Sequence, residues 1–194
     1  MAVKVLCILE RRQSRAERPA KIRSRRKRPA VRKVRRATIM SNRFMARAIE
    51  LSLENVRSGK GGPFATVIVE DGKIIAEGTN QVTSSNDPTA HAEIVAIREA
   101  CKKLGTFQLT DCEIYTTCEP CPMCLGAIYW TRPARVYFAN TAEDAATIGF
   151  RDAFIYDEIR QPLTRRRIPM IPLMRDEAQQ AFRAWEEKND RIPY

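Results

Sequence analysis

The sequence predicts a single α/β domain, a three-layer α/β/α sandwich with a mixed five-stranded sheet. Segments with apolar residues at helical spacing alternate with short β-branched runs, as in domains whose helices cover both faces of a sheet. The first two β-type runs are joined by Asp71-Gly72, a tight hairpin signal that adds an antiparallel pair to this sheet. A chain of 194 residues that is 44% hydrophobic can bury one core of this size.

The domain is predicted to begin with a helix and a hairpin. A stripe of apolar residues at helical spacing predicts a helix that starts after Ser41 or Asn42 and ends at Gly59. The two runs beside the hairpin signal then predict buried strands at residues 64–69 and 73–78.

The same patterns continue to the C-terminus. The predicted strands are residues 112–117, residues 135–139 and one edge strand within 162–172. The predicted helices are residues 91–104, 121–130, 142–146, 152–159 and 176–188.

Two short motifs in the middle of the chain point to a metal site. His91 is the only histidine and precedes Glu93 by two residues, and we expect both in the first turn of a helix capped by Thr89. Cys121 and Cys124 are three residues apart, which places both sulfurs on one face at a helix start, where thiolates are favoured. One imidazole and two thiolates can bind zinc and leave its fourth position to water. Glu93 would then handle the protons of that water.

Each motif alone has a simpler interpretation. A lone histidine is usually a surface or core residue, and Cys-x-x-Cys can be a redox pair or half of a zinc ribbon. Together the motifs match the signature of zinc-dependent nucleobase deaminases, in which the glutamate passes a proton to the substrate ring and then to the departing amine. Cys118 offers the main alternative, because a fourth ligand would close a structural zinc site. Its position at a strand end before Pro120 disfavours that role, and a closed site would leave Glu93 without a function.

The strong basic charge belongs to one end of the chain. The net charge is +11, but residues 1–40 hold 15 of the 34 Lys and Arg residues and two of the 23 acidic ones, so the remainder carries −2. We expect residues 1–40 to be a disordered basic extension outside a domain at 41–194. Three explanations compete: sequence upstream of a true start at Met40, which we favour, an RNA-binding arm, or an Arg-rich transit peptide.

Cysteine usage and hydropathy bear on the compartment. Three of the six cysteines cluster between residues 118 and 124, which is unlike a disulfide framework and favours a reducing compartment, the cytoplasm. No apolar run approaches the length that spans a membrane. The nearly neutral domain is not expected to bind nucleic acid or membranes.

Several motifs resemble the cytidine deaminase-like superfamily, namely His91-Ala92-Glu93 and the segment from Cys118 to Ile128. Within it the chain is most similar to bacterial guanine deaminases. The motifs that carry this resemblance are Gly61-Gly62-Pro63-Phe64, Ser85-Asn86-Asp87-Pro88-Thr89-Ala90, Ile128-Tyr129-Trp130, Gly149-Phe150-Arg151-Asp152 and the terminal Tyr194. The resemblance covers the chain from about Phe44 onward. It implies a cytidine deaminase-like fold, one Zn²⁺ per subunit, and hydrolytic removal of the 2-amino group of guanine to give xanthine and ammonia.

The resemblance also implies substrate contacts. Asn80 would hydrogen-bond the purine, and Phe64 and Trp130 would form walls for the ring. Asp152 would meet the polar edge of the base or assist proton transfer. The backbone N–H of Ala92, beside the metal ligand, is a further candidate donor to the substrate, or it serves only the helix.

The C-terminus and the alternatives complete these expectations. Guanine deaminases of this type are homodimers that exchange C-terminal segments, which implies that residues 160–194 are swapped and that Tyr194 closes the partner's pocket.

One alternative is a tRNA-specific adenosine deaminase, which shares the run from Asp87 to Glu93 and could use the basic extension to bind phosphates. The slightly acidic domain disfavours it. Other small-ring deaminases, and a non-enzymatic RNA-binding protein with a structural zinc, are the remaining alternatives.

Overall fold

The computed structural model describes residues 42–193, so the predicted basic extension and Tyr194 lie outside the described residues. The strands are β1 (Ala65–Glu70), β2 (Lys73–Thr79), β3 (Cys112–Cys118) and β4 (Arg135–Asn140). The helices are α1 (Arg43–Arg57), α2 (Val82–Ser85), α3 (Ala92–Leu104), α4 (Pro122–Thr131), α5 (Ala142–Thr147), α6 (Ala153–Arg160), the 3₁₀ helix η2 (Leu163–Arg165) and α7 (Arg175–Glu187).

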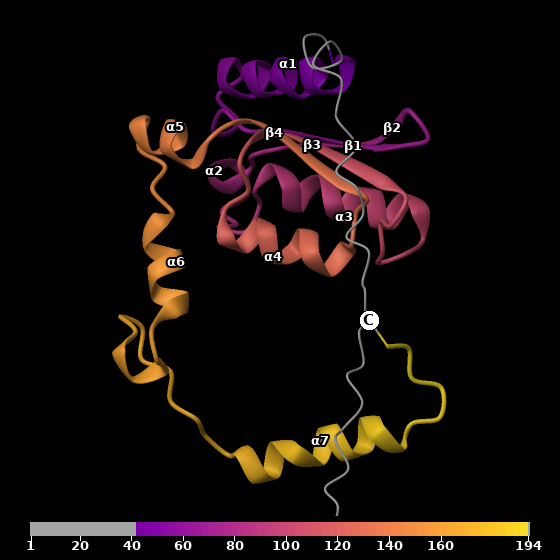
Figure 1. Cartoon of the computed structure of the whole chain (residues 1–194), viewed down its shortest axis with the longest axis vertical. Coiled ribbons are helices and arrows are strands. Elements are labelled where there is room, and N and C mark those ends of the chain that lie inside the picture. Colours follow the sequence, from indigo (N-terminus) through magenta and orange to yellow (C-terminus); the bar gives the residue numbers. More distant parts are fainter. Residues whose placement is uncertain (1–41, 194) are drawn as a thin grey trace, which may run out of the picture. The chain divides into compact units, whose positions relative to one another are not determined.

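The strands form one mixed sheet in the order β2-β1-β3-β4 (Figure 1). β1 runs antiparallel to both β2 and β3, and β3 runs parallel to β4. The predicted mixed α/β sheet is therefore confirmed, but within residues 42–193 it has four strands instead of five. The expected edge strand within 162–172 is wrong. Pro162, Pro169 and Pro172 lack the N–H groups that a strand needs for pairing, and part of the segment forms η2.

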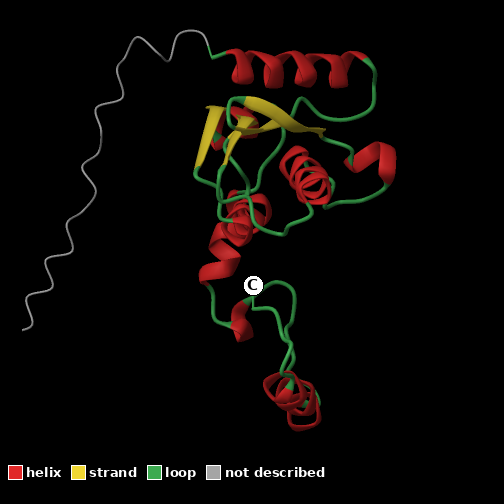
Figure 2. Ribbon diagram, turned by 90° about the vertical axis from the view of Figure 1, so that its right-hand side faces the viewer, coloured by secondary structure: helices red, strands yellow, loops and turns green. Residues whose placement is uncertain are grey.

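The side chains of β1 show how the three layers are held together. Val67 and Val69 pack with the buried face of α1, whereas Ile68 belongs to the apolar cluster formed with α3 and α4. This alternation follows because successive side chains of a strand point to opposite faces of the sheet. Figures 1 and 2 show α1 on one side of the sheet and α3 and α4 on the other.

A glycine in β2 allows α3 to lie directly against the sheet. A Cβ atom at Gly78 would lie 2.3 Å from the carbonyl oxygen of Ala92 and 2.5 Å from the backbone nitrogen of Ala96. No other residue fits this contact without moving the helix. The close packing fixes the height of the first turn of α3 above β2.

The helix starts agree only in part with the predicted caps. Asn42 is the N-cap of α1, and its Oδ1 accepts from the N–H groups of Phe44 and Met45 at 2.9 and 3.3 Å. The predicted capping role of Thr89 is wrong. Its N–H and hydroxyl both donate to Asp87, and His91 occupies the N-cap position of α3. The short helix α2 is not among the predicted helices.

The buried core lies in the first two thirds of the domain. Thr131 is the last buried residue of the described chain, and no residue between 132 and 193 is buried. Apolar side chains of the C-terminal region that are more than 60% exposed include Ile168, Ile171, Leu173, Met174, Phe182 and Ile192. Among the described helices, none is long and apolar enough to cross a bilayer.

Candidate functional site

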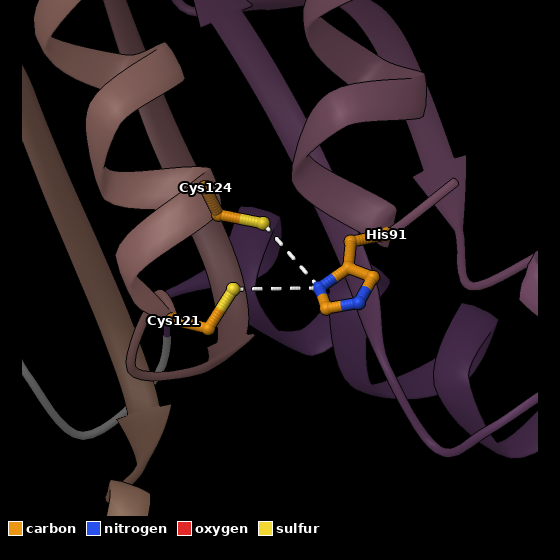
Figure 3. A group of neighbouring side chains, drawn as sticks. All are labelled: His91, Cys121 and Cys124. Carbon is orange, nitrogen blue, oxygen red and sulfur yellow. Dashed lines mark hydrogen bonds between the residues drawn. The ribbon is translucent and has the colours of Figure 1, made fainter. Parts of the chain in front are cut away.

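Three potential metal ligands meet where α3 and α4 begin. His91 is the N-cap of α3, Cys121 is the N-cap of α4, and Cys124 lies in the first turn of α4. The Nδ1 atom of His91 is 3.5 Å from each of the two sulfurs (Figure 3). The three donor atoms all lie within 4.8 Å of one another.

The separation of these atoms fits a tetrahedral zinc ion. Zinc bonds of about 2.3 Å to sulfur and about 2.0 Å to nitrogen, at a tetrahedral angle, separate the two ligand atoms by about 3.5 Å. The cluster does not include Cys118, whose thiol instead donates to the carbonyl oxygen of Thr141 at 3.6 Å. The residues therefore fit zinc with three protein ligands, the arrangement of catalytic sites rather than closed structural ones.

The surroundings of Cys121 favour the thiolate form, which is the form that binds a cation. Hydrogen bonds from Cys124 and His91 lower the pKa of the Cys121 thiol to about 4, so it is a thiolate at neutral pH. The hydrogen bond to Cys121 and burial raise the pKa of Cys124. The pKa of His91 is raised by its hydrogen bond with Cys121. Zinc would displace the Cys124 proton and bind both sulfurs as thiolates.

Glu93 lies beside the ligands and is almost fully buried. Its carboxyl group is on the second residue of α3 and accepts from the Cys124 thiol at 3.5 Å. The side chain is 6% exposed, and burial raises its pKa above the usual range. A buried carboxyl group beside metal ligands is placed to take up and release protons in a reaction.

A cavity of about 390 Å³ opens onto His91, Glu93 and Cys121. Its walls include Phe64 and Asn80, two of the residues predicted to contact the substrate. This volume is within the range of small-molecule pockets.

Asn80 is held with its amide directed to the cavity. Its Oδ1 accepts from the backbone N–H groups of Gly62 and Val82, both at 3.4 Å. No hydrogen bond to the rest of residues 42–193 uses its Nδ2, which leaves that group to donate to a ligand. The backbone carbonyl of Asn80 accepts from Asn55 at 2.9 Å, and the same Asn55 amide donates to Gly62. Asn55 therefore positions the loop that carries Asn80.

The loop between α5 and α6 covers one side of the cavity. The Phe150 ring packs edge-on against Phe64, with ring centroids 4.8 Å apart and an interplanar angle of 88°. This contact brings the next two residues, Arg151 and Asp152, to the cavity wall. Asp152 is at the N-cap position of α6 but its side chain makes no capping hydrogen bond, and burial raises its pKa.

Two predicted substrate contacts, Trp130 and Ala92, do not line the cavity formed by the described residues. Trp130 is 64% exposed, because Cys124 and Ile128 on α4 face the core and Trp130 lies on another side of that helix. Its predicted role as a wall stays a prediction. Ala92 is buried against β2 and does not line the cavity, so a role for its N–H stays a prediction. Tyr194 lies outside the described residues.

Other cavity residues were missed. Glu119, Phe150 and Arg151 belong to recognised motifs but were given no role, although a carboxylate beside the cysteine segment and an aromatic and a basic residue directly after Gly149 were available signals. Asn55 gave no sequence signal, because its position depends on contacts between distant segments.

Known proteins share this domain and site. The model of the cytidine and deoxycytidylate deaminase zinc-binding region matches residues 39–140. The chain is 56% identical to the guanine deaminase of Bacillus subtilis over 151 residues, covering 78% of this chain and 97% of that protein. The crystal structure of guanine deaminase from Bacillus subtilis superimposes with a TM-score of 0.77 at 54% identity, over 79% of this chain and 99% of that one.

A tRNA-specific adenosine deaminase of Aquifex aeolicus is 47% identical over 77 residues, only 40% of this chain and 51% of that protein. The family match and the relatives agree with the three-ligand zinc geometry and the mixed sheet. The chain belongs to the cytidine and deoxycytidylate deaminase family of zinc-dependent hydrolases.

Proposed function

We propose that this protein catalyses the zinc-dependent hydrolysis of guanine to xanthine and ammonia. The main support is its 56% identity to a guanine deaminase over 97% of that protein's length. The cavity agrees with this substrate class, since it combines aromatic and polar groups suited to one flat, polar heterocycle. One zinc ion per subunit completes the catalytic group.

Glu93 is the proposed proton carrier. When bound, zinc makes a water molecule acidic enough to act as a nucleophile at neutral pH. The buried carboxyl of Glu93 takes the proton of that water and passes it to the ring nitrogen beside C2. Glu93 then takes the remaining proton from the new hydroxyl on C2 and delivers it to the 2-amino group, so that the C2–N bond breaks, the C2–O bond becomes a carbonyl, and ammonia leaves.

Asn80, Phe64 and Asp152 are the proposed contacts that hold the base. The Asn80 amide is fixed through its oxygen and can donate to a ring acceptor. Phe64, supported by Phe150, offers a flat apolar surface for the purine. Asp152 lines the cavity and can accept from a ring N–H or share in proton transfer. Fixed contacts of this kind would hold C2 in line for attack.

The test is ammonia release by the zinc-loaded protein. We expect turnover of guanine that is abolished by a chelator and restored by zinc, with little or no turnover of cytosine, cytidine, adenine or a tRNA anticodon stem-loop. Activity on the stem-loop instead would favour the tRNA deaminase. RNA binding without any deamination would favour a structural zinc protein, although the separate position of Cys118 speaks against a fourth ligand.

We also propose a homodimer in which residues 160–194 are exchanged between subunits and Tyr194 closes the partner's cavity. The support is the region from 132 to 193, in which no described residue is buried while large apolar side chains stand exposed. Such surfaces generally mark contacts with another chain. Light scattering should give about twice the 22.2 kDa chain mass.

Residues 1–40 are proposed to lie outside the catalytic domain, and the cytoplasm is the proposed location. The matched family region begins at residue 39, and the rest of the chain carries a net charge of −2 once the basic segment is set aside. A chain that begins at Met40 should deaminate guanine as fast as the full chain. Mass spectrometry of the native N-terminus will determine whether the cell makes a peptide containing residues 21–33.

A further inference from the structure

Apart from the metal ligand His91, the cavity contains one basic side chain among the described residues that line it. Arg151 is that residue, and the other charged groups in the wall are the carboxylates of Glu93, Glu119 and Asp152 beside the metal ligands. A lone guanidinium in an otherwise acidic wall is the natural partner for an electron-rich group on the ligand.

The position of Arg151 is set by its neighbours. Phe150 is anchored on Phe64, and Asp152 starts α6, so the residue between them is held at the cavity edge. A Cβ at Gly62 would meet the Phe150 ring at 3.3 Å, which shows how closely this loop lies over the residues before β1. Arg151 is exposed and Glu93 is buried, so Arg151 belongs to a more solvent-accessible part of the cavity wall than Glu93 does.

Among the described residues, the guanidinium of Arg151 has no hydrogen-bond or ion-pair partner, even though Glu119 and Asp152 line the same cavity. Arg47 and Arg135 are paired with Glu77 and Glu113 at 2.9 and 3.3 Å, whereas Arg151 shares its lack of a described partner with exposed arginines such as Arg57 and differs from Arg57 in lining the cavity. Its five N–H donors are therefore available to a ligand.

We infer that Arg151 binds the O6 and N7 edge of guanine and makes the enzyme selective for 6-oxopurines. This inference rests on the proposed function. When C2 lies at the metal end of the cavity, O6 and N7 lie on the side of the purine away from it. These two acceptors match the fork of a guanidinium, which is the common way in which arginine recognises guanine.

The same contact discriminates against 6-aminopurines. A 6-amino group presents hydrogen-bond donors to the donors of Arg151, so a ring of the same size is repelled at that edge. One bidentate pair of this type contributes about 1–3 kcal/mol of discrimination, or roughly 5- to 150-fold in affinity.

The test compares rings that differ in the 6-oxo group and in the N1 proton that accompanies it. We expect Arg151→Ala to raise the KM for guanine at least fivefold while kcat changes less than threefold. The KM for 2-aminopurine, which has the same reacting C2 but no O6, should change less than threefold. Competitive inhibition supplies a readout without turnover: the Ki of hypoxanthine should rise in the variant, and that of purine should not. Arg151→Lys should recover only part of the effect, because an ammonium cannot form the fork.

The matched control is Arg57→Ala, which removes an exposed arginine of α1 outside the cavity and should leave all four constants unchanged. Equal losses with guanine and 2-aminopurine, or no change in either KM, would overturn the inference while leaving the proposed function in place. A wild-type protein that binds zinc but does not deaminate guanine would remove the proposed function itself, and the inference with it.

Discussion

Glu93 combines burial, a neighbouring thiol and a place in the first turn of a helix. The residue is 6% exposed, its carboxyl group accepts from Cys124, and burial raises its pKa. A buried acid without a pairing cation is costly to a fold. We therefore regard Glu93 as retained for proton transfer and not for stability.

Glu93→Gln should keep zinc and lose turnover. The amide has nearly the same shape but cannot carry a proton, so kcat for guanine should fall by about 10²- to 10⁴-fold while KM changes little. Metal content by atomic absorption, measured beside the kinetics, separates loss of chemistry from loss of zinc. Glu99→Gln, on the exposed side of the same helix, is the control. A Glu93→Gln enzyme with near-normal kcat would exclude this residue as the proton carrier.

We expect Tyr115 to make the free energy of unfolding depend on pH, independently of the metal site. Its ring is 4% exposed and stacks on Tyr137 with centroids 4.7 Å apart, and burial raises its pKa to about 12. In the unfolded chain the pKa is about 10, so the unfolded state loses its proton first. The free energy of unfolding should therefore fall as pH rises from about 10 to 12, by up to about 1.4 kcal/mol per pH unit from this group.

Urea unfolding at pH 9, 10 and 11 measures this fall. Tyr115→Phe lacks the ionisable group and should lose less stability over that range than the wild type. Its lower stability at pH 9, caused by the lost hydrogen bond to Glu113, does not affect the comparison of slopes. Identical slopes in the two proteins would show that Tyr115 does not set the alkaline limit.

At the scale of single residues, the sequence was a good guide where the chemistry is local. His91, Cys121 and Cys124 come from two short motifs, and their spacing alone brings three donors to the starts of two helices. Asn55 positions Asn80, which lies 25 residues further along the chain. A single sequence contains no spacing signal for such a contact. Arg151 lies in a motif that the sequence analysis named, but that motif does not show that Arg151 lines the same cavity as the metal ligands.

At the scale of elements, the packing of α3 on β2 decides where the site forms. Gly78 permits the contact, and His91 and Glu93 stand at the end of α3 that touches it. A glycine inside a strand usually weakens it, so its presence here is explained by the helix that lies upon it.

Gly78→Ala should therefore damage both fold and site. The added Cβ would overlap backbone atoms of Ala92 and Ala96, and relief requires α3 to move. We expect a loss of about 1–3 kcal/mol in unfolding free energy, with weaker zinc binding. Gly126→Ala in α4 is the matched control, because nothing lies within 4 Å of its Cβ and alanine favours helix by up to about 1 kcal/mol. Equal stability of wild type and Gly78→Ala, measured by urea unfolding, would contradict this account.

Whether a segment forms a helix or a strand could be predicted for most of the chain. Errors occur where tertiary contacts or backbone chemistry override the pattern of apolar residues. The hairpin, the mixed sheet and the helices of the core follow from periodicity and turn signals. The expected edge strand was wrong because three prolines interrupt it. The predicted Thr89 cap was wrong because Asp87 binds that side chain, leaving the metal ligand His91 at the helix start.

At the scale of the whole molecule, the distribution of burial is uneven. Every buried residue of the described chain lies at or before Thr131, while α7 presents Phe182 and Trp185 at 66% and 44% exposure. A terminal helix with such exposed apolar side chains buries little apolar surface against its own chain, so contacts within that chain stabilise it only weakly. This distribution supports the proposed exchange of C-terminal segments between two subunits.

Complementation between two inactive variants tests the exchange. A chain lacking residues 192–194 keeps Glu93 but not Tyr194, and Glu93→Gln keeps the tail. If each tail closes the partner's cavity, unfolding and refolding the two variants together should restore about a quarter of wild-type activity, because half of the dimers are mixed and each has one complete site. Mixing the folded variants just before the assay is the control. No recovery in mixed dimers verified by mass would show that tails close their own cavity or none.

The placement of His91 and Cys121 at the starts of α3 and α4 has a consequence for the cell. One bound ion would link two helices that otherwise contact each other mainly through apolar packing. It would therefore stabilise the fold as well as take part in the reaction. Each tenfold rise in free zinc above its dissociation constant adds about 1.4 kcal/mol to the folded state. When zinc is scarce, the protein would lose folding stability together with activity. Purine breakdown would then decline as the zinc concentration falls.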